Sequence, residues 1–464
     1  MSAARTSTAS SANVHARAHG RGGDHEADGE QHYAATLQAL LSLSEISGGS
    51  PLPPREGRME RMRALLNALG NPDGRAAVVH IAGTNGKGST AALIAAAASA
   101  GGFRVGLFTS PHLHSMRERI RTGLEPIAAA DFVTAFEAVR YAAKQVERAG
   151  LGTPSTLETL TAMAFHHFAR VDAQLQVIEA FVGGRTDITN VVQPNLCVIT
   201  NISLDHAEAL GGSLAAIASA KAGILKPGVA VVIGPQRREA LQVILSEADR
   251  QHARRHYVPS WKVAAHARCP PTTSLENQAV AATVLHELAR HGFPIARDVR
   301  NQAWRQLQWP ARGEWIGTAT IAVVADGAHC GWAMQRLVRE LRRAGRNRDA
   351  YVVFGGQVGH DVRETASELL RLQPQRLLLT ASRHPRAIPV AELARRLAGL
   401  NGAIEGGAEV APSVAAALET ARALAKSGDL VVVTGSLAVA AEAREALLPR
   451  LVMDPRGTPA GRSA

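Results

Sequence analysis

The sequence predicts an α/β fold with two domains. Short runs rich in Val, Ile and Leu alternate with Ala- and Leu-rich helical stretches along most of the 464 residues. Alternation of this kind is typical of a mainly parallel sheet with helices on both of its faces. The length suits two to three domains, at ~150 residues each.

The first series of elements runs to residue 308. We expect helices at 33–43, 59–69, 89–100, 130–148, 156–169 and 213–222, and strands at 77–81, 104–109, 175–179, 196–200 and 229–233. Ser213 is the expected N-cap of the helix that carries Lys221. Residues 254–274 show no clear pattern.

A second series follows an interruption at Trp309-Pro310, because the residue before a proline disfavours helix. Its expected strands are 320–325, 350–354, 376–380 and 430–434. We therefore expect a P-loop-type N-terminal domain at 31–308 and a smaller Rossmann-like C-terminal domain at 309–450. Residues 1–30, rich in Ser, Ala, His and Gly, read as a disordered tail, and 451–464 as a flexible one.

Composition narrows the function classes. A hydrophobic content of 46% with 20% charged residues is that of a globular chain and excludes a mainly disordered or collagenous one. The net charge is +11, but the arginines are scattered, and only 4% of the residues are aromatic, which leaves few platforms for stacking bases. We expect anionic small molecules as partners, with nucleic acid as a weaker alternative.

The chain also has few features of a secreted or membrane protein. Its three cysteines lie far apart and form no CxxC pair, which suits a reducing compartment. No apolar run of ~18 residues and no secretory signal is evident. We expect a cytoplasmic monomer that contacts neither membrane nor nucleic acid.

The sharpest local signal is a glycine-rich turn between a predicted strand and a predicted helix. It comprises Gly83, Thr84, Asn85, Gly86, Lys87, Gly88, Ser89 and Thr90. Glycines let backbone N–H groups approach phosphate oxygens, and the start of the helix adds positive potential. Lys87 can reach the β- and γ-phosphates, and Ser89 or Thr90 can contact Mg²⁺. The usual GxxxxGK[ST] pattern is not matched, because Gly88 separates Lys87 from Ser89, so this prediction rests on context.

Other predicted strands also end in polar residues, where ligands of parallel sheets bind. Ser110 follows one strand, Glu179 ends another, and His206 lies shortly after a third. Asp326 ends a strand of the second series. Lys221 lies in an Ala-rich helix, and a buried lysine must pair, shift its pKa or be modified. These residues predict an Mg²⁺- and ATP-dependent enzyme with its cleft between the two domains.

The order and spacing of many segments resemble the folylpolyglutamate synthase/dihydrofolate synthase family, a branch of the Mur ligase superfamily. The matching segments are 58–71, 80–90 (HIAGTNGKGST), 106–121, 183–192, 199–228, 309–312 (WPAR), 326–329 (DGAH), 384–387 and 434–437. The resemblance implies that ATP converts a carboxylate into an acyl phosphate and that the amine of L-glutamate then forms an amide.

The resemblance also implies roles for individual residues. The residues from Gly83 to Thr90 would bind ATP, with Arg312, Asp326 and His329 as nucleotide contacts from the C-terminal domain. Ser110 and Glu179 would hold one Mg²⁺ and His206 a second. Lys221 matches a lysine that is carbamylated with CO₂, so that it becomes a metal-binding anion. Lys87, His206 and Lys221 would form the catalytic set.

Three positions depart from the family pattern. Phe181 replaces a glycine, Cys330 replaces the asparagine of DGAHN, and the Asp-Lys-Asp loop reads Gly359-His360-Asp361. The first hypothesis is a ligase that adds L-glutamate to dihydropteroate, to a folate or to both. The alternatives are a divergent relative that joins another carboxylate and amine, and a nucleotide-binding protein without turnover.

Overall fold

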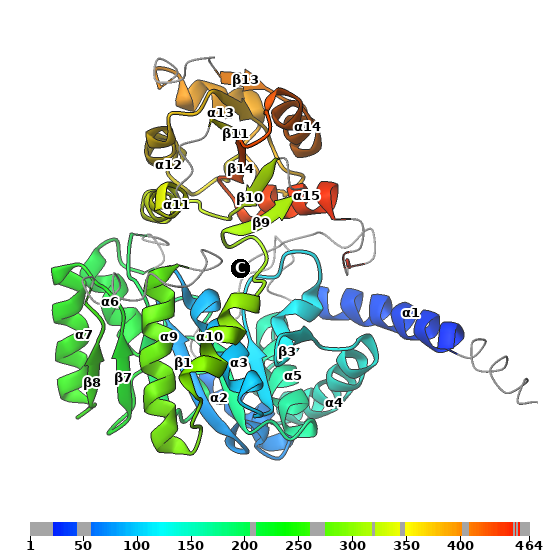
Figure 1. Cartoon of the computed structure of the whole chain (residues 1–464). Helices are drawn as coiled ribbons and strands as arrows, with labels where there is room; N and C mark the ends of the chain where they lie inside the picture. The colour runs from blue at the N-terminus through cyan, green and yellow to red at the C-terminus, as the bar shows by residue number, and fades with distance from the viewer. Residues whose placement is uncertain are drawn as a thin grey trace, which may run out of the picture.

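The computed structural model describes residues 22–43, 57–204, 210–259, 274–317, 321–343, 349–400, 408–448, 451 and 453–454. Two α/β units lie one above the other in Figure 1. His206, and most of the two predicted tails, fall outside the described residues.

The first unit is built on an eight-stranded sheet with the order β4-β3-β2-β5-β1-β6-β7-β8. The strands are β1 (Ala77–Ala82), β2 (Val105–Phe108), β3 (Ile120–Thr122), β4 (Glu125–Pro126), β5 (Leu175–Glu179), β6 (Leu196–Ile199), β7 (Ala230–Ile233) and β8 (Arg255–Tyr257). All pair in parallel except β3 and β4, which extend one edge as an antiparallel hairpin. The predicted mainly parallel sheet is confirmed.

Helices cover both faces of this sheet. The helices are α1 (Gly22–Leu41), α2 (Arg58–Ala68), α3 (Lys87–Ala100), α4 (Ala129–Arg148), α5 (Thr156–Arg170), α6 (Leu214–Ala222), α7 (Arg238–Arg250), α9 (Leu275–Leu288) and α10 (Arg297–Gln306). One apolar core joins α3, α9 and α10 to alternate strand residues such as Val79 and Ile81. Intervening residues such as Val78 and Cys197 face two cores on the other side, one with α1, α2, α4 and α5 and one with α6 and α7.

The second unit has a six-stranded sheet with the order β13-β12-β11-β14-β10-β9. Its strands are β9 (Glu314–Gly317), β10 (Ala322–Ala325), β11 (Ala350–Phe354), β12 (Arg376–Leu379), β13 (Ala408–Val410) and β14 (Leu430–Thr434), and only β9 is antiparallel. One face packs on α11 (Gly331–Arg343), α12 (Val362–Leu369) and α13 (Val390–Leu397), and the other on α14 (Val414–Leu424) and α15 (Leu437–Leu447). The chain changes sheets between Tyr257 and Glu314, and the domain bounds themselves stay predictions.

Two expectations about the ends of the chain need correction. Helix α1 begins at Gly22, so residues 22–30, which we expected in the disordered tail, are helical. Asp454, which we expected in the flexible C-terminal tail, is fixed against the first unit. Its carboxylate accepts hydrogen bonds from Tyr33 Oη (2.5 Å), Ser115 Oγ (2.7 Å) and Met116 N (2.9 Å).

This contact could not be foreseen because its partners are remote in the sequence. Burial and the Asp454 carboxylate both raise the pKa of Tyr33, so its hydroxyl keeps its proton and donates. The loop after β2 also meets the second unit, since Leu113 packs on an apolar cluster formed by Ala311, Ile316, Ala325 and Ala440. The loop 110–119 therefore contacts both the second unit and the C-terminal segment that contains Asp454.

Candidate active site

The glycine-rich turn joins β1 to α3 as predicted, and its backbone requires glycine at two positions. Gly83 has φ +149°, and a Cβ atom there would lie 1.8 Å from Thr200 Oγ1. Gly86, the N-cap of α3, has φ +85°, and its Cβ would lie 2.2 Å from Asn277 Oδ1. Because β6 and α9 approach the turn so closely, a side chain at either position would clash with them.

Neighbouring strands hold this turn in place. Thr84 N–H donates to the carbonyl of Asn201 (2.8 Å), just after β6. From α6, the buried Lys221 Nζ donates to the carbonyl of Gly83 (2.8 Å). The predicted cap of α6 is confirmed, since Ser213 Oγ accepts from Ala216 N (3.1 Å). Contacts from the segment after β6 and from α6 thus hold the turn in place without a ligand.

A carboxylate faces the start of α3. Glu179, the last residue of β5, is 3% exposed, and its Oε1 lies 3.7 Å from Lys87 Nζ. Its Oε2 accepts from Ser110 N (3.1 Å). Burial raises the pKa of Glu179, although the charge of Lys87 opposes the shift. A nearby cation stabilises a charged carboxylate in this buried position.

These groups supply the oxygen ligands that Mg²⁺ prefers. The Glu179 carboxylate and the hydroxyl-bearing residues Ser110 and Ser89 border one cleft. Among the described residues, no three side chains of His, Cys, Asp and Glu gather as a ready-made metal site. The donor set therefore fits an Mg²⁺ ion that completes its shell with phosphate oxygens and water.

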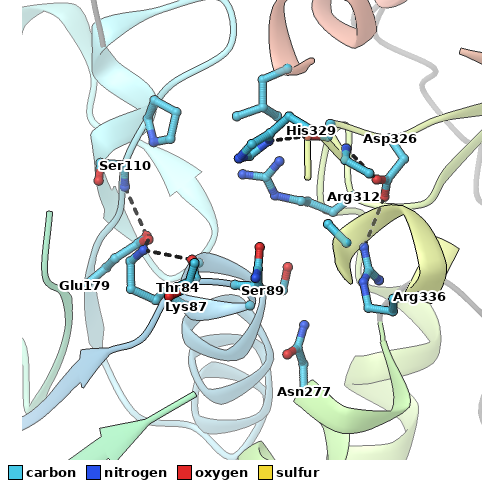
Figure 2. A pocket seen from close by; sticks show the side chains of 18 of the residues that line it. Thr84, Lys87, Ser89, Ser110, Glu179, Asn277, Arg312, Asp326, His329 and Arg336 are labelled. Atoms are coloured by element: carbon cyan, nitrogen blue, oxygen red, sulfur yellow. Dashed lines mark hydrogen bonds and ion pairs between the residues drawn. The ribbon is translucent and has the colours of Figure 1, made fainter. Parts of the chain in front are cut away.

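The second unit faces this loop across the cleft (Figure 2). Asp326, 1% exposed at the end of β10, accepts from Ala328 N (2.8 Å) and lies 3.5 Å from Arg336. Burial lowers the pKa of Arg312, while Asp326 and Glu179 oppose that shift. His329 Nδ1 lies 2.8 Å from the carbonyl of Gly327 and donates a hydrogen bond to it.

The cleft has about 1090 Å³ of empty space, part of it open to solvent. Of the predicted site residues, Thr84, Asn85, Gly86, Lys87, Gly88, Ser89, Ser110, Glu179, Arg312, Asp326 and His329 line it. Gly83 and Thr90 support the loop, and Lys221 lies beneath it at the Gly83 carbonyl. The position of His206 is outside the described residues.

Sequence reasoning missed several residues that line the same cleft. Asn277 comes from α9 and Arg336 from α11. Arg119 is 3% exposed and also lines the cleft. The local sequence does not distinguish Arg119 from its neighbour Arg117, because the burial of Arg119 depends on the folded loop, where its Nε–H donates to His112 Nδ1.

Of the three departures from the family pattern, Phe181 lines the cleft, and Cys330 and His360 contact residues that line it. The ring of Phe181 meets Phe108 edge to face, with centroids 5.5 Å apart, and the positive φ of its loop falls on Gly183. Cys330 Sγ lies 3.8 Å from Asn85 Oδ1 across the cleft. His360 packs on His329, with centroids 4.6 Å apart. The replacement of glycine by Phe181 is thus compatible with its backbone.

Comparisons with known proteins agree with this architecture. The Mur ligase middle domain model matches residues 81–265, and the Mur ligase glutamate ligase domain model matches 311–437. The folylpolyglutamate synthase of Lacticaseibacillus casei is 30% identical over 90% of this chain and 99% of its own length. Four other relatives are matched over only 43% to 51% of their own length, so this chain spans about half of them.

Solved structures match over nearly their whole length. The folylpolyglutamate synthase of Mycobacterium tuberculosis, complexed with ADP, has a TM-score of 0.78 at 27% identity and covers 90% of this chain and 99% of its own. The Yersinia pestis bifunctional folylpolyglutamate synthase/dihydrofolate synthase, complexed with AMPPNP and a Mn ion, has a TM-score of 0.75 at 26% identity, with coverage of 89% and 98%.

Two α/β units that match the Mur ligase middle and glutamate ligase domains, facing each other across the glycine-rich turn, define a protein of the Mur ligase class. Within that class, the chain belongs to the folylpolyglutamate synthase/dihydrofolate synthase family. The resemblance drawn from the sequence is confirmed. In the part of the chain that the structure describes, no helix is long and apolar enough to cross a bilayer.

Proposed function

We propose that this chain is an ATP- and Mg²⁺-dependent ligase that adds L-glutamate to dihydropteroate, to a folate or to both. One observation carries the proposal: Lys87, Ser110 and Glu179 of the first unit face Arg312 and Asp326 of the second across one cleft. A reaction that joins a nucleotide, a carboxylate and an amine needs such a cleft, because its catalysis is mainly positioning and charge neutralisation.

The nucleotide lies, in this proposal, between the two units. The N–H groups of the turn and the start of α3 hold the phosphates. Lys87 Nζ, 3.4 Å from the carbonyl of Thr84, reaches the β- and γ-phosphate oxygens. Arg312, Asp326 and His329 contact the nucleotide from the second unit. The buried Asp326, fixed by Ala328 N, suits a hydroxyl donor such as a ribose.

Ser110 and Glu179 would hold one Mg²⁺, and His206 a second. When bound, Mg²⁺ neutralises phosphate charge and orients the transferred group. The chain's own contribution is to fix Glu179 through Ser110 N and to keep Lys87 beside it.

Lys221 is proposed to be carbamylated. In that step the neutral amine attacks the carbon of CO₂, one N–C bond forms, and one proton is released. The buried cation becomes an anion next to the phosphate loop. Its position supports this role, because Nζ already touches the Gly83 carbonyl that the loop places beside the cleft.

The proposed reaction has two steps. A carboxylate oxygen of the acceptor attacks the γ-phosphorus, the β–γ bridging bond breaks, and ADP leaves. The glutamate nitrogen attacks the acyl carbon, phosphate leaves, and the nitrogen loses a proton. That the enzyme is a cytoplasmic monomer with small molecules as its only partners stays a prediction from the sequence.

The test is an assay of the purified chain with ATP, Mg²⁺, bicarbonate, L-glutamate and either dihydropteroate or tetrahydrofolate. Phosphate release that needs both acceptor and glutamate, with a product one glutamate heavier, supports the proposal and identifies the acceptor. Lys87→Ala should lose at least ~10²-fold in rate. The exposed Lys144→Ala is the matched control and should keep it. ATP binding without product from either acceptor would refute the folate assignment.

A further inference from the structure

A buried guanidinium of the first unit borders the cleft, and no carboxylate of the described residues lies within ion-pair distance of it, although the charges of Glu179 and Glu118 act on it from farther away. Arg119, at the end of the short 3₁₀ helix Met116–Arg119, is 3% exposed. Its Nε–H donates to His112 Nδ1 at 2.9 Å. Because Nδ1 accepts this bond, the ring proton is on Nε2 and the imidazole is neutral. In the described part of the chain, Arg119 forms no ion pair with a carboxylate.

Other buried arginines of this protein are held differently. Arg61 makes a two-pronged ion pair with Glu158, with both distances 2.9 Å. Arg444 Nε lies 2.8 Å from Glu314 Oε2. The carboxylate next to Arg119 in sequence is already engaged, since Glu118 accepts from three backbone N–H groups, those of Leu113, His114 and Ser115.

A neutral partner fixes the guanidinium and leaves its charge available. Burial lowers the pKa of Arg119 to about 10, so it remains a cation at neutral pH. The carboxylates of Glu179 and Glu118 oppose this shift, but neither forms an ion pair with Arg119, and a buried cation without a directly bound counter-charge is stabilised when an anion binds it. Arg119 lines the cleft, so that anion can come from a bound substrate.

The residues around Arg119 indicate which substrate this is. Arg119 directly precedes β3, Pro111 follows β2, and Phe181 and Val182 follow β5, which are neighbouring strands. All four residues line the cleft. The nucleotide contacts come from elsewhere, from the turn after β1, from α9 and from the second unit. The region near β2 and β5 thus combines apolar walls with one cation, which suits a flat apolar body that ends in a carboxylate.

We propose that Arg119 binds the carboxylate of the acceptor and that His112 is a positioning residue that holds Arg119 without neutralising it. The proposal rests on the proposed function and assigns a residue to acceptor recognition. Phe181, braced by Phe108, forms the apolar wall. Arg119 holds one carboxylate oxygen, and the other attacks the γ-phosphorus. The same guanidinium stays beside the acyl group until phosphate leaves.

The first experiment compares Arg119→Gln with Arg117→Gln. The two arginines belong to the same 3₁₀ helix, but Arg117 points away, donating to the Ile127 carbonyl (2.7 Å) and pairing with Glu30 (3.1 Å). We expect Arg119→Gln to weaken acceptor binding about 10- to 150-fold, the range for a hydrogen bond to a charged group. Affinity for AMPPNP should change less than threefold, and Arg117→Gln should keep wild-type values for both.

The decisive readout is discrimination between the acceptor and its carboxamide, measured with dihydropteroate, or with tetrahydrofolate if only that acceptor turns over. Wild type should prefer the carboxylate, and Arg119→Gln should lose the preference. If Arg119→Gln keeps the preference, or if it weakens AMPPNP instead, the inference is overturned. If wild type neither binds nor converts an acceptor, the proposed function fails first, and this inference with it.

Variants of His112 test the neutral partner. His112→Asn retains an acceptor atom and should keep the carboxylate preference. His112→Asp also retains an acceptor but adds a negative charge, so it should reduce the preference although the protein stays folded. A merely structural role for His112 would make the two variants alike, and that result would remove His112 from the proposal.

Discussion

Gly83→Ala should weaken nucleotide binding strongly and lower the stability of the protein only slightly. Gly83 has φ +149°, and an added Cβ would lie 1.8 Å from Thr200 Oγ1, 3.0 Å from Thr200 Cβ and 3.2 Å from Thr200 Cα. Thr200 cannot easily yield. It is 1% exposed, its N–H donates to the Ala82 carbonyl (2.8 Å), and its own carbonyl accepts from Gln236 (2.6 Å). The loop must move instead.

The size of the effect follows from these distances. Restoring an ordinary separation of ~3.5 Å from Thr200 Oγ1 needs a shift of roughly 1.7 Å. A misplacement of ~1 Å can cost ~10²-fold in rate. The backbone strain of alanine at this φ adds about 1–3 kcal/mol. We therefore expect a loss of at least ~10²-fold in kcat/KM for ATP, with weaker AMPPNP binding, and a melting temperature only a few degrees lower.

The assay combines AMPPNP titration, ligase turnover and thermal unfolding. Gly102→Ala is the matched control, because Gly102 has φ +90° but no heavy atom within 4 Å of the added Cβ. It should lose similar stability and keep its activity. Adding Thr200→Ala to Gly83→Ala removes the 1.8 Å contact and should restore part of the activity. A Gly83→Ala variant with more than a third of wild-type kcat/KM would refute the reasoning.

Three further predictions concern stability and the lysine modification. Burial lowers the pKa of His80 to about 3. Below pH ~6.5 the unfolded state therefore binds more protons, and stability falls as the pH falls. The contribution of His80 at pH 5 is about 2 kcal/mol, so urea unfolding of His80→Gln should lose about that much less between pH 7 and 5. An unchanged pH slope would contradict this. Tyr33→Phe, which removes the bond to Asp454, should cost about 1–3 kcal/mol in urea unfolding. Tyr141→Phe, at a ring that is 72% exposed, should cost nothing, and equal losses would count against the contact. CO₂-free buffer should reduce ligase activity through Lys221 and bicarbonate should restore it, whereas indifference to bicarbonate would argue against the carbamate.

The sequence predicted what local pattern determines. The turn Gly83–Thr90 and Glu179 were found because each lies at the end of a β-branched run, and parallel strands bring such ends together. Lys221 was singled out because lysine is rare in this chain and its helix is apolar. These residues do meet at one edge of the first sheet.

The site residues that could not be predicted from the sequence depend on contacts between distant segments. Asn277 gains its place only when α9 packs on α3, and Arg336 only when the second unit faces the first. Arg117 and Arg119 are alike in the sequence, yet only Arg119 lines the cleft, where its Nε–H donates to His112 Nδ1. Tertiary packing thus places Arg117 and Arg119 differently, and the spacing of residues within the segment does not encode that difference.

The hydrogen bond from Tyr33 to Asp454 has a consequence for biosynthesis. The two residues are 421 positions apart, so at ~5–20 residues per second the ribosome needs roughly 20–80 s to deliver the partner of Tyr33. During that interval α1 and the loop that carries Arg119 lack their last three hydrogen bonds. The N-terminal unit of a nascent chain therefore lacks these contacts until Asp454 has been added, and a chain that ends before Asp454 would form without them.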